Sequence, residues 1–511
     1  HQEIVALLTD ALFNQSWKEF QGKYIHDLNQ TPEDKHPLRA MTSLAAHCEL
    51  VGKIFRLLDR AVVPKGDELA GTLSLRDVEK VDSLKKARKS WSLSVLRVEI
   101  LRLQHPIHTR DINIFPAIQE AIEQIQAGPF SDHVIFATSG ALWLILLPGQ
   151  DQNLDNILKP LLNLGLIISC VAKSSPFHSV TFPSTEELNT AESNTHIYYT
   201  FPRLPAKIDR DICEICQMRP GTREPPDEDT GVIETLCDCC ESIRRRSDRF
   251  KKLAEWSEGP VLWCRVELNS DDLVGHVNNL YRLYLKSLRY DDNSPVIPTP
   301  EKVNILVKRL QPAALLAEYA QDYRLFLSGF WKQVLSKLNK IQLDIDSCVE
   351  QISGLGNAAD VFTIKIERPG IPDSILDAFR ISLQEWFPIS ANNDDCPVRI
   401  GLSIAPAKHP FFLHWENLKT LTKTINLFPP ARLPVRANLA QLDALKQVVS
   451  GMGRSYLHNL AHIERQTGSR MMVEIKIIDD WKHAFLENVR KAGIAVTDVL
   501  GYHAMTEFGC E

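Results

Sequence analysis

The stretch CVEQISGLGNAADVFTIKI, residues 348–366, reads as a β-hairpin, because two apolar runs flank a turn that contains glycine. A strand, GPVLWCRVELN (259–269), and a long amphipathic helix that begins at Pro312 precede it. A helix, PDSILDAFRISLQEWF (372–387), and a strand, CPVRIGLSIAP (396–406), follow it. The order strand, helix, hairpin, helix, strand predicts a ferredoxin-like unit.

The same order occurs earlier in the chain. SLSVLRVEILRLQ (92–104) reads as a buried strand and FPAIQEAIEQIQ (115–126) as a helix that has Pro near its first turn. HVIFATSGALWLILLPG (133–149) reads as a hairpin, ILKPLLNLG (157–165) as a helix and LIISCVA (166–172) as a strand. The sequence therefore predicts an α+β fold with two ferredoxin-like units, and this duplication is its most informative feature.

A cluster of cysteines lies between the two units. CEIC (213–216) and CDCC (237–240) form two Cys-x2-Cys pairs separated by twenty residues. Two such turns can direct four thiolates at one ion, so the expected ligands are Cys213, Cys216, Cys237 and Cys240. The expected ion is a structural Zn2+, because four thiolates leave no open position for a substrate. Cys239 is a spare thiol that could compete with Cys237, and four reduced structural cysteines are the alternative interpretation.

A basic segment, ESIRRRSDRFKKLAEW (241–256), follows the cysteines and reads as a helix. Its cationic side chains could grip a nucleic-acid backbone, or they could be an ordinary solvated helix face. The candidate nucleic-acid-binding residues are Arg244, Arg245, Arg246, Arg249, Lys251 and Lys252.

The bulk composition limits the function classes. The chain has 511 residues, which predicts several domains, and a net charge of −6 gives no overall attraction to nucleic acid. No apolar run approaches the ~20 residues of a membrane helix, and residues 1–20 lack a signal-peptide pattern. An odd total of eleven cysteines favours a reducing cytoplasm. No phosphate-binding loop, dinucleotide fingerprint or serine elbow is present in the sequence.

The expected organisation has five parts. They are a helical N-terminal domain (1–90), a first ferredoxin-like domain (91–205), a zinc-binding module (206–258), a second ferredoxin-like domain (259–410) and a helical C-terminal domain (411–511).

This organisation resembles the large palm-domain subunit of type III CRISPR–Cas effector complexes. FATSGALWLILLPG (136–149) is similar to the hairpin of the family's first palm. VELNSDDLVG (266–275) lies where the second palm carries two aspartates, and NAADVFTI (357–364) lies where the later hairpin carries Gly-Gly-Asp-Asp. The resemblance covers most of the chain and implies two palm domains around a zinc module.

Active members of that family join ATP into cyclic oligoadenylates at two metal ions held by palm carboxylates. The resemblance puts Glu267, Asn269, Ala359 and Asp360 at the acidic positions. Ala359 cannot ligate an ion and Asn269 is a weaker, neutral ligand. The sequence therefore predicts an inactive palm, and a slipped register through Asp271 and Asp272 would not restore the hairpin.

The segment YIHDLNQTPEDKHP (24–37) resembles the His-Asp pair that opens the HD-type nuclease domain of many family members. His26 and Asp27 are weak candidates for that site, which needs further ligands around a divalent ion. An HD-type, metal-dependent nuclease acting on single-stranded DNA is thus the alternative function.

The resemblance implies a structural subunit of a prokaryotic, cytoplasmic RNA-guided complex. Its expected partners are the 5′ end of the crRNA, target RNA, and backbone and small helical Cas subunits, with no membrane. Guide base pairing would read sequence in such a complex. A stand-alone zinc-ribbon protein that binds nucleic acid is a third interpretation.

Overall fold

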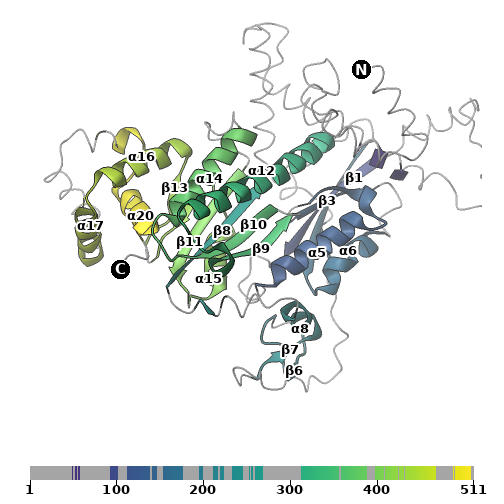
Figure 1. The fold of residues 1–511 in the computed structure, drawn as a ribbon. Helices are drawn as coiled ribbons and strands as arrows, with labels where there is room; N and C mark the ends of the chain where they lie inside the picture. Colours follow the sequence, from purple (N-terminus) through teal and green to yellow (C-terminus); the bar gives the residue numbers. More distant parts are fainter. Residues whose placement is uncertain are drawn as a thin grey trace, which may run out of the picture.

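The computed structural model describes the following residues: 49, 52–53, 56–57, 92–101, 112–137, 141–146, 153–176, 195–198, 211–216, 219–223, 233–245, 253, 255–256, 259–268, 312–355, 358–387, 398–407, 409–423, 425–430, 432–467, 473, 487 and 489–507. Two mainly antiparallel sheets and their helices form most of the described structure, and a small unit with two short strands lies outside these sheets (Figure 1). The chain is thus of the mixed α+β class that the sequence predicts.

The first half of the chain forms a five-stranded sheet in the order β2-β3-β1-β4-β5, in which all neighbours are antiparallel. Its elements are β1 (Ser92–Leu101), α5 (Ile114–Ala127), β2 (Val134–Ala137), β3 (Ala141–Leu146), α6 (Leu154–Asn163), β4 (Ile167–Pro176) and β5 (Thr195–Tyr198). The order of β1 to β4 and their helices agrees with the sequence-based order. β5 was not expected, and it extends the sheet beyond β4.

The second half forms a six-stranded sheet in the order β13-β12-β11-β8-β10-β9. Its first elements are β8 (Pro260–Leu268), α12 (Pro312–Lys340), α13 (Ile345–Cys348), β9 (Val349–Leu355), β10 (Ala358–Lys365), α14 (Ile371–Trp386) and β11 (Val398–Pro406). The strands β9, β10, β8 and β11 take the same relative places as β2, β3, β1 and β4 in the first sheet. The two halves therefore repeat one strand order.

The region after residue 410, which the sequence predicts to be mostly helical, also contains two short strands. It contains α15 (Phe411–Leu418), β12 (Ile425–Phe428), β13 (Val435–Ala437), α16 (Leu439–Gly451), α17 (Arg454–Thr467) and α20 (Val496–Glu507). β12 pairs in parallel with β11, and β13 pairs with β12, so the second sheet continues past residue 410. The two strands are too short to give a periodic signal between prolines, which explains why the sequence pattern did not predict them.

The two halves pack against each other reciprocally. α12 of the second half contacts β2 of the first, and α5 of the first half contacts β9 of the second (Figure 1). Trp143 and Ile145 on β3 accordingly belong to the hydrophobic core around α12, whereas Trp263 on β8 belongs to the core around α5. Each core therefore contains side chains from both halves.

Only a few residues before β1 are described, at helical positions between residues 49 and 57. Leu57 is buried in the core around α12. Arg56 Nε donates to Asp132 Oδ1 at 2.8 Å, and Lys53 Nζ donates to the Val134 carbonyl at 3.1 Å. These contacts attach the segment to the start of β2. No helix in the described ranges combines the length and the apolar character that crossing a bilayer requires.

Candidate metal centre and the second-half hairpin

The four predicted cysteine ligands come together in one buried cluster. The sulfur atoms of Cys213, Cys216, Cys237 and Cys240 all lie within 4.8 Å of one another. The Cys216 and Cys237 sulfurs are 3.8 Å apart, far longer than a disulfide bond of about 2.05 Å. A tetrahedral ion with metal–sulfur bonds of about 2.3 Å separates its sulfurs by about 3.8 Å. The donor set therefore fits a four-thiolate metal site, and it is the one such group of His, Cys, Asp or Glu among the residues described.

Two short segments position these thiols in the cysteine module, which we define as residues 211–245. The first pair lies in a loop that is closed by hydrogen bonds from the Cys213 amide to the Arg219 carbonyl and from the Gly221 amide to the Asp211 carbonyl, both 2.8 Å. The second pair opens α8 (Asp238–Arg244), where Cys237 is the N-cap residue. The strands β6 (Thr222–Arg223) and β7 (Thr235–Leu236) pair to join the two segments.

The thiols influence one another strongly. Hydrogen bonds from Cys216, Cys237 and Cys240 lower the pKa of the Cys213 thiol, which favours a thiolate in the cluster. The pKa of Cys240 is raised, because it supplies hydrogen bonds to the other sulfurs. Cys239 instead points away, its thiol 3.7 Å from the Asn163 carbonyl, and burial raises its pKa. Cys239 is therefore not part of the four-sulfur group.

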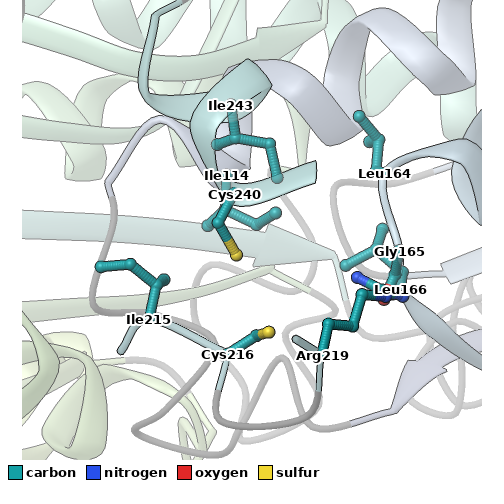
Figure 2. A pocket seen from close by; sticks show the side chains of 9 residues that line it. All are labelled: Ile114, Leu164, Gly165, Leu166, Ile215, Cys216, Arg219, Cys240 and Ile243. Atoms are coloured by element: carbon teal, nitrogen blue, oxygen red, sulfur yellow. The ribbon is translucent and has the colours of Figure 1, made fainter. Parts of the chain in front are cut away.

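The cysteine module rests on the first half through Arg219, a residue that sequence reasoning missed. Its side chain is 5% exposed, and Nη2 donates to the Gly165 carbonyl at 2.6 Å. Figure 2 shows Arg219 reaching toward Gly165 while Cys216 and Cys240 face each other nearby. Gly165 has a φ of +73°, and a Cβ there would lie 1.7 Å from Arg219 Nη1. The turn after α6 therefore requires glycine for its backbone and for the space that the guanidinium fills.

The second contact between the module and the first half is made by α8. Ile243 on α8 is buried in the same core as Ile114 on α5. The Arg244 carbonyl at the end of α8 accepts a hydrogen bond from Asn113 Nδ2 at 3.2 Å. Asn113 is the N-cap residue of α5 and is 1% exposed. The module is therefore fixed at the start of α5 as well as at the turn after α6.

Two of the six predicted nucleic-acid-binding residues are described, and both form ion pairs within the module. Arg244 pairs with Glu234, and Arg245 pairs with Glu241 one helical turn earlier. Arg245 remains well exposed, with 71% of its side chain accessible. Arg246, Arg249, Lys251 and Lys252 lie outside the described residues. α8 ends at Arg244, and Leu253 and Glu255, farther along the expected helix, are at helical positions.

Glu267, the first of the predicted palm positions, lies near the end of β8 between two arginines. Its carboxylate is 2.7 Å from Arg265 Nη2 and 3.9 Å from Arg399 Nη1. Arg399 lies directly opposite Glu267 on β11. All three side chains are less than one quarter exposed, at 23%, 14% and 18% for Glu267, Arg265 and Arg399. Both carboxylate oxygens therefore face guanidinium groups.

The same arginines hold the segment after α15. Arg265 Nη1 donates to the Leu418 and Lys419 carbonyls at 2.7 and 2.9 Å, and Arg399 Nη1 donates to the Leu421 carbonyl at 2.8 Å. The Trp415 ring covers Arg265, with 4.8 Å between the guanidinium carbon and the ring centroid. Glu267 thus belongs to a structural network at the carbonyl end of α15, where positive charge is favourable.

Asp360 lies on β10, beside an irregularity in the pairing with β9, and is 3% exposed. Burial first, and then the negative charge of Asp360, raise the pKa of Tyr323 on α12. Ala359 is in β10, and Asn269 lies outside the described residues. Among the described residues, Glu267 and Asp360 do not form part of any cluster able to hold a metal ion. His26 and Asp27 also lie outside the described residues.

Comparison with known proteins gives structural neighbours but no sequence match. No family model matches the chain, and no curated protein matches it. The chain is similar to a Csm1–Csm4 cassette solved in complex with cA4, with a TM-score of 0.47, 10% identity, and coverage of 93% of this chain and 75% of that one. A Csm1–Csm4 cassette in complex with pppApApA has a TM-score of 0.45 and 11% identity, with coverage of 92% of this chain and 74% of that one. The Csm1–Csm4 subcomplex in the type III-A CRISPR–Csm interference complex has a TM-score of 0.41 and 11% identity, with coverage of 92% of this chain and 75% of that one.

Proposed function

We propose that this chain is the structural large subunit of a CRISPR RNA-guided, type III-like effector ribonucleoprotein. In this role it helps to hold the 5′ end of the crRNA and the partner subunits. The single observation that carries the proposal is the repeated strand order of the two sheets around a four-cysteine cluster. The two hairpins whose sequences resemble the family, β2 with β3 and β9 with β10, take the same place in their sheets, which supports the proposal.

We further propose that the two sheets are ferredoxin-like palm domains and that the cysteines hold a structural Zn2+. A four-thiolate site with no open coordination position would order a segment that buries too few apolar side chains to fold by itself. Among the described residues of the cysteine module, few buried apolar residues lie beside the four ligands, which supports this role. The N-terminal and C-terminal parts would flank the palms and meet other subunits.

The palm site of the second half would not make cyclic oligoadenylates. Two-metal catalysis needs carboxylates that are free to bridge both ions. Glu267 is instead engaged by Arg265 and Arg399, and position 359 carries alanine. A metal ion could bind Glu267 only by displacing guanidinium groups that also hold the segment after α15.

RNA contact would come from the basic segment after the cysteines and not from overall charge. Arg245 presents an exposed side chain, and Arg246, Arg249, Lys251 and Lys252 follow it in the sequence. Phosphate contacts by such residues make binding weaker as salt concentration rises.

The test is to purify the tagged full chain from its host and to identify what accompanies it. We expect other Cas subunits and RNA of uniform length with a repeat-derived 5′ handle. With target RNA, ATP, and Mg2+ or Mn2+, we expect no oligoadenylate, whereas an active large subunit assayed in parallel makes it. Purification without RNA would refute the proposal, and oligoadenylate synthesis would refute its inactive palm.

The same preparation tests the alternative nuclease. Cleavage of single-stranded DNA that is lost in His26→Ala and Asp27→Ala variants would establish the HD-type activity. Cleavage that is absent, or unchanged in these variants, would remove it.

A further inference from the structure

Among its described residues, the cysteine module contacts the first half through two short segments, and each segment carries one cysteine ligand pair. The loop of the first pair supplies Arg219, and the helix of the second pair supplies Ile243 and the Arg244 carbonyl. Figure 2 shows Arg219 and Ile243 around one small space between the module and the first half. The docking surface and the ligand cluster are therefore built from the same two short segments.

The first contact is tied to the cluster through the backbone. The Cys213 amide donates to the Arg219 carbonyl at 2.8 Å, so the position of the arginine depends on the shape of the ligand loop. The arginine side chain then donates to the Gly165 carbonyl at 2.6 Å in a buried setting. A buried guanidinium needs hydrogen-bond partners, since its desolvation is costly without them. Loss of the loop shape would move Arg219 away from Gly165.

The second contact is tied to the cluster through α8. Cys237 and Cys240 lie at the start of this helix of seven residues, and Ile243 and Arg244 lie at its end. A helix this short is not stable by itself in water, so its ends are held by tertiary contacts. One end is held by the sulfur cluster, and the other by Asn113 and the core around α5. Loosening either end would loosen the other.

We propose that metal binding at the four cysteines and docking of the module on the first half are one coupled step, with Arg219 as the residue that connects them. The inference rests on the metal site of the proposed function but goes beyond it. When the site is loaded, the ligand loop is ordered and Arg219 is presented to the turn at Gly165. When the site is empty, the ligand loop is no longer ordered. The turn after α6 and the start of α5 then lose their contacts with the module and become more accessible to solvent. Linkage makes the effect reciprocal, so weaker docking also weakens metal binding.

The first test uses the full-length wild-type chain with its metal removed by a chelator and restored by Zn2+. Amide hydrogen exchange is measured in peptides that cover residues 163–168 and 112–118. We expect exchange at least tenfold faster after removal and full protection after restoration. Elemental analysis before and after removal reports the metal content. Unchanged exchange in a chain shown to have lost its metal would overturn the coupling, while a preparation that never contains metal would overturn the metal site as well.

The second test uses Arg219→Met, which keeps the length of the side chain but removes its hydrogen bonds. We expect the Zn2+ affinity of this variant to be roughly tenfold weaker, because a hydrogen bond from a charged group is strong enough to cause such a loss. Competition with a chromophoric chelator measures the affinity. The matched control is Arg223→Met on β6, an exposed position of the same module, for which we expect unchanged affinity. Equal affinity of Arg219→Met and wild type would contradict the proposal. A purely structural role of Arg219 would speed exchange at Gly165 without moving the affinity.

Discussion

At the scale of single residues, Glu267 shows how a position that resembles a catalytic acid can serve the fold. We predict that Glu267→Gln destabilises the protein by about 1–2 kcal/mol, because the positive charges of Arg265 and Arg399 lose the negative carboxylate that they pair with. Chemical denaturation of the full chain measures this. The control is Glu385→Gln at an exposed position of α14, which should change stability by less than about 0.5 kcal/mol.

The sign of that change separates two roles for Glu267. Acids gathered in an empty metal pocket repel one another, so neutralising one of them stabilises the protein. A carboxylate between two guanidinium groups gives the opposite result. Stabilisation by Glu267→Gln would therefore show that the carboxylate belongs to a metal pocket after all.

The residues of the candidate site were predictable to different degrees. The four cysteines could be predicted because ligands of one ion must recur at short, fixed spacing. Arg219 could not, since a single arginine in a polar linker gives no pattern that shows it to be buried. The partners of Glu267 were equally hidden, because Arg399 lies 132 residues later and meets it only through the register of β8 and β11. Local sequence predicts ligand sets well and long-range charge pairing poorly.

At the scale of elements, long periodic segments were predictable and short strands were not. α12 begins at Pro312 as its apolar spacing and proline indicate, and the hairpin of β9 and β10 lies where the sequence predicts it. β12 and β13 have only four and three residues and are defined by pairing with β11 and with each other. Their place in the sheet depends on neighbours that local sequence does not reveal.

The packing of α20 on this added edge can be tested at Gly501. A Cβ at Gly501 would lie 2.5 Å from Cγ2 of Val435 on β13, a β-branched and buried side chain. We predict that Gly501→Ala destabilises the protein by about 1–3 kcal/mol through overpacking, although alanine favours a helix by up to about 1 kcal/mol. Thermal or chemical denaturation measures the change.

Gly451 at the end of α16 is the matched control for this prediction. A Cβ there would meet no atom within 4 Å. Gly451→Ala should therefore leave stability unchanged or raise it by less than about 1 kcal/mol. If Gly501→Ala behaves like this control, α20 does not pack on β13 as closely as the structure indicates.

At the scale of the whole molecule, the two halves share their cores. The sequence predicts two repeated units, but periodicity gives no information on how one unit meets the other. In the structure, the first helix of each half contacts the edge strand of the other half's hairpin. The halves also meet where Phe115 on α5 packs on Trp415 of α15, with 4.6 Å between ring centroids. We therefore expect the halves to unfold together.

Trp143 on β3 tests this expectation. It is 3% exposed and belongs to the core around α12, although it comes from the first half. We predict that Trp143→Ala lowers the free energy of unfolding by about 3–5 kcal/mol and speeds amide exchange in α12 as well as in β2 and β3. The control is Leu325→Ala, at a position of α12 that is 42% exposed, which should lower the free energy of unfolding by less than about 1 kcal/mol. Faster exchange confined to β2 and β3 would mean that the halves are independent, because a shared core must transmit the loss to the helix that covers it.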